Sequence, residues 1–202
     1  MDTNSRIRRA HINDALDIAA FVDIAGHGVD LDQWMTARDG DELVFSAARR
    51  LVTEDLSLPY HYSRAHIVEV GGRVAGGLIG GLIAKEEAAQ EGDPAHVEPL
   101  IALENRVPGY WNIFAIAVYP EFRGRGLAST LLDYADHLAL QIGARGLSIV
   151  AEDTNARARA LYEKRGFKIE ASLPWIAFGG RVGPSQWLML TKPLVDRANS
   201  GS

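Results

Sequence analysis

The stretch YPEFRGRGLAS, residues 119–129, decides how this chain is interpreted. It follows an apolar run, WNIFAIAV at 111–118, that is typical of a buried strand. It precedes a leucine-rich segment at 126–142 with the periodicity of an amphipathic helix. Most strand-to-helix turns need a single glycine, yet this one places Gly124 and Gly126 beside Arg123 and Arg125.

At the start of a helix, several backbone N–H groups have no intrahelical partner, and the helix dipole adds positive potential. Glycines remove the Cβ atoms that would keep a ligand away, and the two arginines add formal charge. The pattern favours a diphosphate or a similar anion on the helix N-terminus, with a purely structural turn as the alternative. No nucleotide-binding motif identifies the anion. The Gly-Lys-Ser/Thr end of a phosphate-binding Walker loop is absent, and Ser129 stands where a dinucleotide fingerprint needs its third glycine.

The composition indicates an ordinary soluble globular protein. The chain has 202 residues, 47% of them hydrophobic and 23% charged, with a net charge of −5 that argues against nucleic acid as the main partner. The absence of cysteine excludes disulfides, thiolate metal ligands and a cysteine nucleophile. No signal-peptide core and no membrane-spanning apolar run occur, so a cytoplasmic protein is expected.

Hydrophobic periodicity predicts a mixed α/β chain with one strand–helix–strand unit in its second half, whose two strands are parallel. A single domain is expected over 1–194, followed by a polar tail at 195–202. The first helix is expected at 13–26, with Asn13 or Asp14 as its cap and Leu16 on its buried face. One or two helices are expected over 30–37 and 41–55, and others at 126–142 and 155–166. The strands are expected at 5–10, 65–70, 74–84, 110–118, 146–152, 167–173 and 185–194.

Two segments carry open alternatives. The strand at 74–84 contains four glycines, which indicate either bulges and twist or the close approach of another backbone or a ligand. The segment 85–109 is a long loop with room for one short helix, and it has six acidic residues against Lys85 and Arg106. Its charge is either a solubilising feature or an acidic wall for a cationic substrate.

Two motifs together resemble the GNAT superfamily of acyl-CoA-dependent N-acetyltransferases. FAIAVYPEFRGRGLASTLL at 114–132 meets the family's Arg/Gln-x-x-Gly-x-Gly/Ala signature with Arg123, Gly126 and Ala128. NARARALYEKRGF at 155–167 is similar to its second signature, an asparagine followed by Leu-Tyr-Glu and Gly-Phe. The resemblance implies a twisted, mostly antiparallel sheet with splayed parallel central strands flanked by helices.

The resemblance also implies acetyl-CoA as cosubstrate. Backbone amides of residues 123–128 would surround its pyrophosphate, and Asn155 would contact its pantetheine arm. The arm would pair with the main chain of the strand end. The implied cofactor-binding residues are Ile116, Ala117, Val118, Arg123, Gly124, Arg125, Gly126, Leu127, Ala128 and Asn155.

Transfer of an acetyl group from sulfur to nitrogen needs a base for the amine, a donor for the oxyanion and an acid for the leaving thiolate. By the resemblance, the N–H of Val118 is the oxyanion donor and Tyr162 stands near the thioester sulfur. A phenol is protonated at neutral pH, so Tyr162 is the candidate acid, with packing of the short helix as its structural alternative. The base is open between Glu152, Glu104 and a water chain, because Val150 occupies the position where some related N-terminal acetyltransferases carry glutamate.

Tyr110 and Trp111, at the start of the strand before the glycine loop, are candidates for the acceptor pocket or for the core. The histidines show no metal-ligand spacing, and no metal is expected. The acceptor is expected to be a small-molecule or peptide amine, without nucleic acid or membrane, and the final strands are a candidate homodimer interface.

The expected activity is direct transfer of acetyl from acetyl-CoA to a primary amine in a ternary complex. Two alternatives stay open. The first is a non-catalytic acyl-CoA sensor, favoured by Val150. The second is an enzyme that holds another nucleotide's phosphates on the glycine loop.

Overall fold

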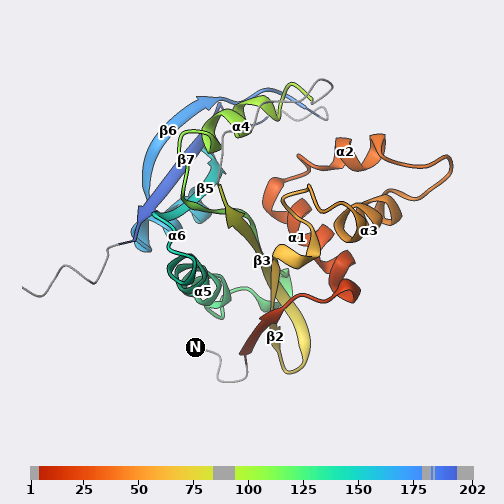
Figure 1. The fold of residues 1–202 in the computed structure, drawn as a ribbon, viewed down its shortest axis with the longest axis horizontal. Helices are drawn as coiled ribbons and strands as arrows, with labels where there is room; N and C mark the ends of the chain where they lie inside the picture. The colour runs from red at the N-terminus through yellow and green to blue at the C-terminus, as the bar shows by residue number, and fades with distance from the viewer. Residues whose placement is uncertain (1–4, 84–93, 179–182, 184, 195–202) are drawn as a thin grey trace, which may run out of the picture. The chain divides into compact units, whose positions relative to one another are not determined.

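The computed structural model describes residues 5–83, 94–178, 183 and 185–194. Its strands form a mixed seven-stranded sheet, in the order β1-β2-β3-β4-β5-β7-β6, with parallel and antiparallel pairs (Figure 1). The strands are β1 Ser5–Arg9, β2 Ala65–Val70, β3 Arg73–Leu82, β4 Trp111–Val118, β5 Gly146–Glu152, β6 Lys168–Pro174 and β7 Gln186–Pro193. The fold class expected from the sequence is confirmed.

Six α-helices and three short 3₁₀ turns accompany these strands in the described residues. The helices are α1 Ala15–Gly26, α2 Leu31–Thr36, α3 Val44–Glu54, α4 Glu98–Glu104, α5 Leu127–Gln141 and α6 Ala156–Lys164. The 3₁₀ turns are η1 Ile12–Asp14, η2 Tyr62–Arg64 and η3 Pro120–Phe122. Helix α4 is the one short helix that the sequence allowed within the segment 85–109.

The chain divides into two compact units. The first unit comprises residues 1–81, 113–133 and 177–183, and the second comprises 82–112, 134–176 and 184–202. Strand β4 and helix α5 each contribute residues to both units. The single domain over 1–194 stays a prediction.

The core of the first unit is built from α1, α2, α3 and the strands beside them. Its fully buried side chains include Ile18, Phe21, Trp34 and Ile67. Leu16 was expected on the buried face of α1 but is 51% exposed, because the face that packs is the one bearing Ala15, Ile18 and Ala19.

Two glycines of β3 decide how closely neighbouring elements approach this strand. A Cβ on Gly76 would lie 2.5 Å from the carbonyl oxygen of Ala117. A Cβ on Gly77 would lie 2.4 Å from the ring of Phe21. Both expected explanations of the glycines are seen here: the register with β2 shifts beside Gly76, and another backbone approaches closely at Gly76.

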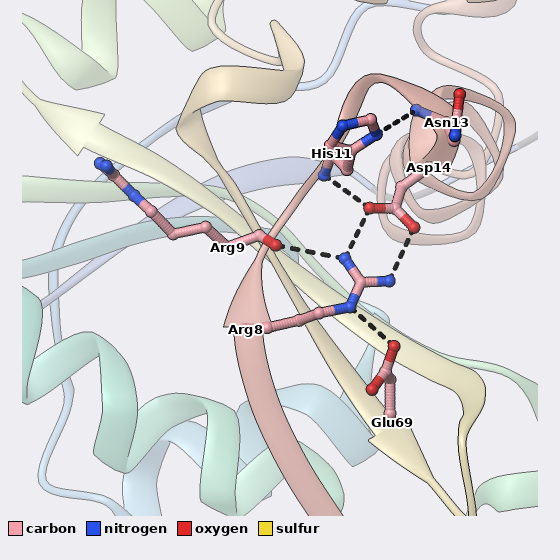
Figure 2. Close-up of polar contacts among 6 residues, drawn as sticks. All are labelled: Arg8, Arg9, His11, Asn13, Asp14 and Glu69. Atoms are coloured by element: carbon pink, nitrogen blue, oxygen red, sulfur yellow. Dashed lines mark hydrogen bonds and ion pairs between the residues drawn. The ribbon is translucent and has the colours of Figure 1, made fainter.

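The start of α1 is joined to the sheet by a charged network centred on Arg8 (Figure 2). The guanidinium of Arg8 donates two hydrogen bonds to the carboxylate of Asp14, of 2.7 and 2.8 Å, and its Nε donates to Glu69 at 2.6 Å. Asp14 also accepts from the backbone N–H of His11 at 2.6 Å. The prediction that Asn13 or Asp14 caps the helix is wrong in its mechanism. Asp14 occupies the cap position but makes no cap hydrogen bond to α1, because its carboxylate is bound by Arg8 and His11.

The second unit contains an antiparallel set in which β7 lies between β5 and β6. Helix α4 packs against all three of these strands. The register of β5 on β7 is unbroken from Gly146 opposite Pro193 to Glu152 opposite Trp187. Side chains therefore alternate strictly between the two faces of β5, with Ser148, Val150 and Glu152 on one face.

Two predictions fall at least partly outside the described residues: the first nine residues of the acidic loop, 85–93, which hold four of its six acidic residues, and the tail at 195–202. Among the helices that the structure describes, none is long and apolar enough to cross a membrane.

Candidate active site

The glycine loop lies between η3 and α5 in the first unit. Gly124 and Gly126 have φ of +80° and +81°, a left-handed conformation that residues with side chains rarely adopt. A Cβ built on either glycine would meet no atom within 4 Å. The glycines are therefore required by backbone conformation, and the space beside them is open.

The backbone amides of this loop are not consumed by the helix. The first helical hydrogen bond of α5 runs from the N–H of Thr130 to the carbonyl of Gly126, at 3.0 Å. Within the described part of the chain, no acceptor takes the N–H groups of the residues before Thr130, namely Gly124, Gly126, Leu127, Ala128 and Ser129. This is the arrangement expected of an anion site at a helix N-terminus.

The two arginines of the loop are placed differently. Arg123 donates from Nε to the carbonyl of Val118 at 3.1 Å, which ties the loop to the end of β4. The guanidinium of Arg125 lies over the ring of Phe122, 5.5 Å from its centre, and Arg73 lies 5.2 Å from the same ring. Both loop arginines are solvent-exposed, and they place positive charge in the loop that holds these amides.

The end of β4 directs one predicted group away from the neighbouring strand. The N–H of Tyr119 donates to Ala75 of β3 at 2.9 Å. Because N–H groups alternate in direction along a strand, the N–H of Val118 points away from β3. This is the N–H expected to act as oxyanion donor.

Tyr119 is a residue of this region that sequence reasoning missed. Its hydroxyl donates to the carboxylate of Asp17 in α1 at 2.6 Å, and its ring lies 4.9 Å from that of Phe21. Burial, followed by the bond to Asp17, raises the pKa of Tyr119 above its usual range. Tyr119 thus fixes the start of the loop against the first helix, and its position inside the opening motif was the only available signal.

Helix α6 carries two predicted site residues in the second unit. Asn155 is the N-cap, and its side-chain oxygen accepts from the N–H of Ala158 at 3.2 Å. Among the described residues, none accepts from the side-chain nitrogen of Asn155. The cap therefore orients this amide and leaves its donor for another group.

Tyr162 is 6% exposed, and its ring packs 5.8 Å from that of Phe167. Its hydroxyl makes no hydrogen bond within the described residues. Burial raises the pKa of Tyr162 above its usual range, so the phenol stays protonated at neutral pH. A buried ring with an unused donor suits a group that donates to a reacting atom.

The two candidate bases occupy one face of the sheet in the second unit. Glu104, in α4, accepts from the side chain of Asn112 at 2.8 Å, and Asn112 accepts from the hydroxyl of Ser148 at 2.9 Å. Glu152 is 6% exposed and shares the face of Ser148. The four residue steps from Ser148 to Glu152 span roughly 13 Å of strand. The two carboxylates therefore mark opposite ends of this face.

The two residues predicted for the acceptor pocket are both packed. Tyr110 lies beneath the guanidinium of Arg145, at 5.6 Å, and a Cβ on Gly146 would meet its ring at 2.5 Å. Trp111 is 5% exposed. These contacts favour the structural alternative for Tyr110, and a role for either residue in acceptor binding stays a prediction.

The loop fits the diphosphate of a coenzyme, since the amides of Gly124 and of residues 126–129 have no partner in the described structure, its glycines leave open space and its arginines supply charge. The N–H of Arg123, expected among the pyrophosphate ligands, instead donates to the carbonyl of Pro120 at 3.2 Å. A metal centre has no comparable support. Across residues 5–83, 94–178, 183 and 185–194, no group of three or more potential metal ligands gathers.

The structure combines a mixed sheet with a strand–loop–helix unit whose amides lack partners, and comparison with known proteins assigns this chain to a family. The model of the acetyltransferase (GNAT) family matches residues 31–167. The chain belongs to the GNAT family of acetyltransferases. No curated protein gave a significant sequence match.

Several solved structures share the fold. An N-acetyltransferase from Staphylococcus aureus Mu50 is 20% identical with a TM-score of 0.62, covering 93% of this chain and 100% of its own. A GNAT-family acetyltransferase from Streptococcus pneumoniae is 23% identical with a TM-score of 0.56, covering 95% and 99%. The ribosomal-protein-S18-alanine N-acetyltransferase of Escherichia coli is 17% identical with a TM-score of 0.56, covering 97% of each chain.

Proposed function

We propose that this protein transfers an acetyl group from acetyl-CoA to a primary amine by direct attack in a ternary complex. The observation that carries the proposal is the glycine loop, where five backbone N–H groups have no partner in the described structure and two glycines border open space at the start of α5. Membership of the GNAT family supports acyl-CoA as the ligand of this loop.

In this proposal, the amides of Gly124 and of residues 126–128 bind the pyrophosphate, and the main chain of Ile116, Ala117 and Val118 pairs with the pantetheine arm. Asn155 donates its unused amide N–H to the same arm. Acetyl-CoA supplies the activated acyl group, and no acyl-enzyme is needed. The chain has no cysteine that could form one.

The reaction requires three functions from the protein: a proton acceptor, an oxyanion donor and a donor to the leaving sulfur. The amine nitrogen loses a proton to Glu152, Glu104 or a water chain as it attacks the thioester carbon. The N–H of Val118 binds the oxyanion, and the carbon–sulfur bond then breaks. Tyr162 donates a hydrogen bond to the departing sulfur. The raised pKa of this phenol favours donation over complete loss of its proton.

The test is incubation with acetyl-CoA and a panel of primary amines while free thiol is followed. We expect amine-dependent thiol release that follows saturation in both substrates. CoA binding without thiol release from any amine would replace the enzyme with the non-catalytic acyl-CoA sensor. That alternative is favoured by Val150, an apolar, half-buried side chain at the position where some related N-terminal acetyltransferases carry glutamate.

A thermal-shift comparison of CoA, NAD and ATP tests the coenzyme separately. We expect CoA to stabilise the protein, because its diphosphate would bind the loop amides and its pantetheine arm would pair with the end of β4. Stabilisation by NAD or ATP but not by CoA would contradict the assignment of the loop.

A further inference from the structure

The sheet face that carries Glu152 also carries an indole whose N–H is unused. Trp187 of β7 is directly opposite Glu152 of β5. Trp187 is 5% exposed, and its Nε1 has no hydrogen-bond partner among the described residues. A buried donor left without an acceptor is costly, so the N–H of Trp187 is a position where a ligand oxygen would be stabilised.

The register brings the two side chains close together. The next pair along the strands, Asp153 and Gln186, is joined by a backbone hydrogen bond of 3.1 Å. In an antiparallel ladder, hydrogen-bonded and non-hydrogen-bonded pairs alternate, so Glu152 and Trp187 form a non-hydrogen-bonded pair. Side chains in such pairs are the closest across a sheet and lie on the same face.

One position of this face reaches the surface. Val150 lies two residues before Glu152 on the same face and is only partly buried. Glu152 and Trp187 themselves are 6% and 5% exposed. At the far end of the face, Glu104 is held by Asn112, which is itself bonded to Ser148. At the end near Trp187, the side chains of Glu152 and Trp187 lie opposite each other on the same face.

We infer that Glu152 and the indole N–H of Trp187 form an acceptor subsite for an amine whose neighbouring carbon bears an oxygen, such as an amino alcohol, an amino ether or an α-amino amide. The carboxylate binds the amine nitrogen, and the indole donates to the oxygen. Plain alkylamines and polyamines place no oxygen there and leave the indole unpaired. The effect of this subsite on catalysis rests on the proposed acetyl transfer.

The kinetic test compares 2-methoxyethylamine with butylamine, a pair of similar length that differs by the oxygen. The measured quantity is the ratio of their kcat/KM values in each protein. Trp187→Phe should lower this ratio roughly tenfold relative to wild type, the size of one neutral hydrogen bond. The KM for acetyl-CoA should not change. Glu152→Gln should lower kcat/KM for both amines.

Trp34→Phe is the matched control, because Trp34 is also buried with an unpartnered indole N–H but lies in α2. It should leave the amine ratio at its wild-type value. An equal loss for both amines in Trp187→Phe would overturn the subsite while leaving acetyl transfer intact. Absence of turnover with any amine would instead contradict the proposed function.

A direct binding measurement covers the case in which Trp187→Phe does not fold. The chain has four tryptophans, so ¹⁵N-labelled indole gives four resonances, and single substitutions of the other three identify that of Trp187. With CoA present, 2-methoxyethylamine should shift the Trp187 resonance and butylamine should shift it less. No shift with the oxygenated amine would refute the subsite without any reference to catalysis.

Discussion

Replacement of Gly76 by alanine should displace the end of β4 that we propose to bind the pantetheine arm. The new Cβ would lie 2.5 Å from the carbonyl oxygen of Ala117 and 3.2 Å from Cα of Val118. Both contacts are with backbone, so rotation of a side chain cannot relieve them. The strands must separate by about 0.5 Å before the closer contact reaches even the 3.0 Å lower limit of real Cβ contacts.

Overpacking of this kind costs about 1–3 kcal/mol, and the lower entropy of the unfolded alanine chain offsets about 0.4–1 kcal/mol of it. A net loss of about 1–2 kcal/mol corresponds to a fall in Tm of roughly 2–8 °C for a chain of this size. We also expect a raised Kd for CoA, because the displaced main chain is the part that pairs with the coenzyme.

Gly81→Ala in the same strand is the matched control. Its Cβ would meet Phe114 at 3.6 Å and Arg64 at 3.8 Å, which are ordinary contacts. Calorimetry and CoA titration of both variants give the two readouts. Equal stability and equal CoA affinity in the Gly76→Ala and Gly81→Ala proteins would refute the role assigned to close approach at Gly76.

Three further predictions concern the loop, the acid and the charged network. Gly126→Glu should weaken CoA binding on the order of 100-fold or more, since its carboxylate repels the diphosphate at short range. Gly143→Glu, also at positive φ in open space but beyond α5, should leave the Kd for CoA unchanged. Tyr162→Phe should lower kcat about 100-fold with little change in CoA affinity, and an unaltered kcat would remove its proposed role. The hydrogen bonds from Arg8 are the main cause of the lowered pKa of Asp14. The pair therefore contributes its full stabilisation at pH values above the pKa of the unfolded carboxyl, about 3.9. This contribution is lost as the pH falls toward the lower pKa of the folded state. Asp14→Asn should therefore lower the free energy of unfolding at pH 7 by about 1–3 kcal/mol and flatten its dependence on pH in the acid range, as urea titrations at several pH values would show.

Local signals in the sequence were enough to place the strands and the loop. The strand expected at 65–70 is β2, Ala65–Val70, because two glycines with positive φ follow it directly. The glycine loop could be predicted equally well, since the backbone conformation at Gly124 and Gly126 requires glycine. Signals of this kind depend only on neighbouring residues.

Long-range partners could not be read in the same way. The bond from Tyr119 to Asp17 joins residues 102 positions apart, and the pairing of Trp187 with Glu152 depends on the register of two distant strands. Asp14 is the N-cap residue as expected, but its side chain makes no cap hydrogen bond for a related reason. A preference for capping is local, but the carboxylate is bound by an arginine that the fold brings beside it.

The division of the chain into two units has a spectroscopic consequence. Trp34 belongs to the first unit, whereas Trp111, Trp175 and Trp187 belong to the second. A protein that keeps Trp34 alone would report by its fluorescence on the melting of the first unit, and a protein that lacks only Trp34 would report on the second. Superimposable melting curves would mean that both units lose their structure in a single cooperative step.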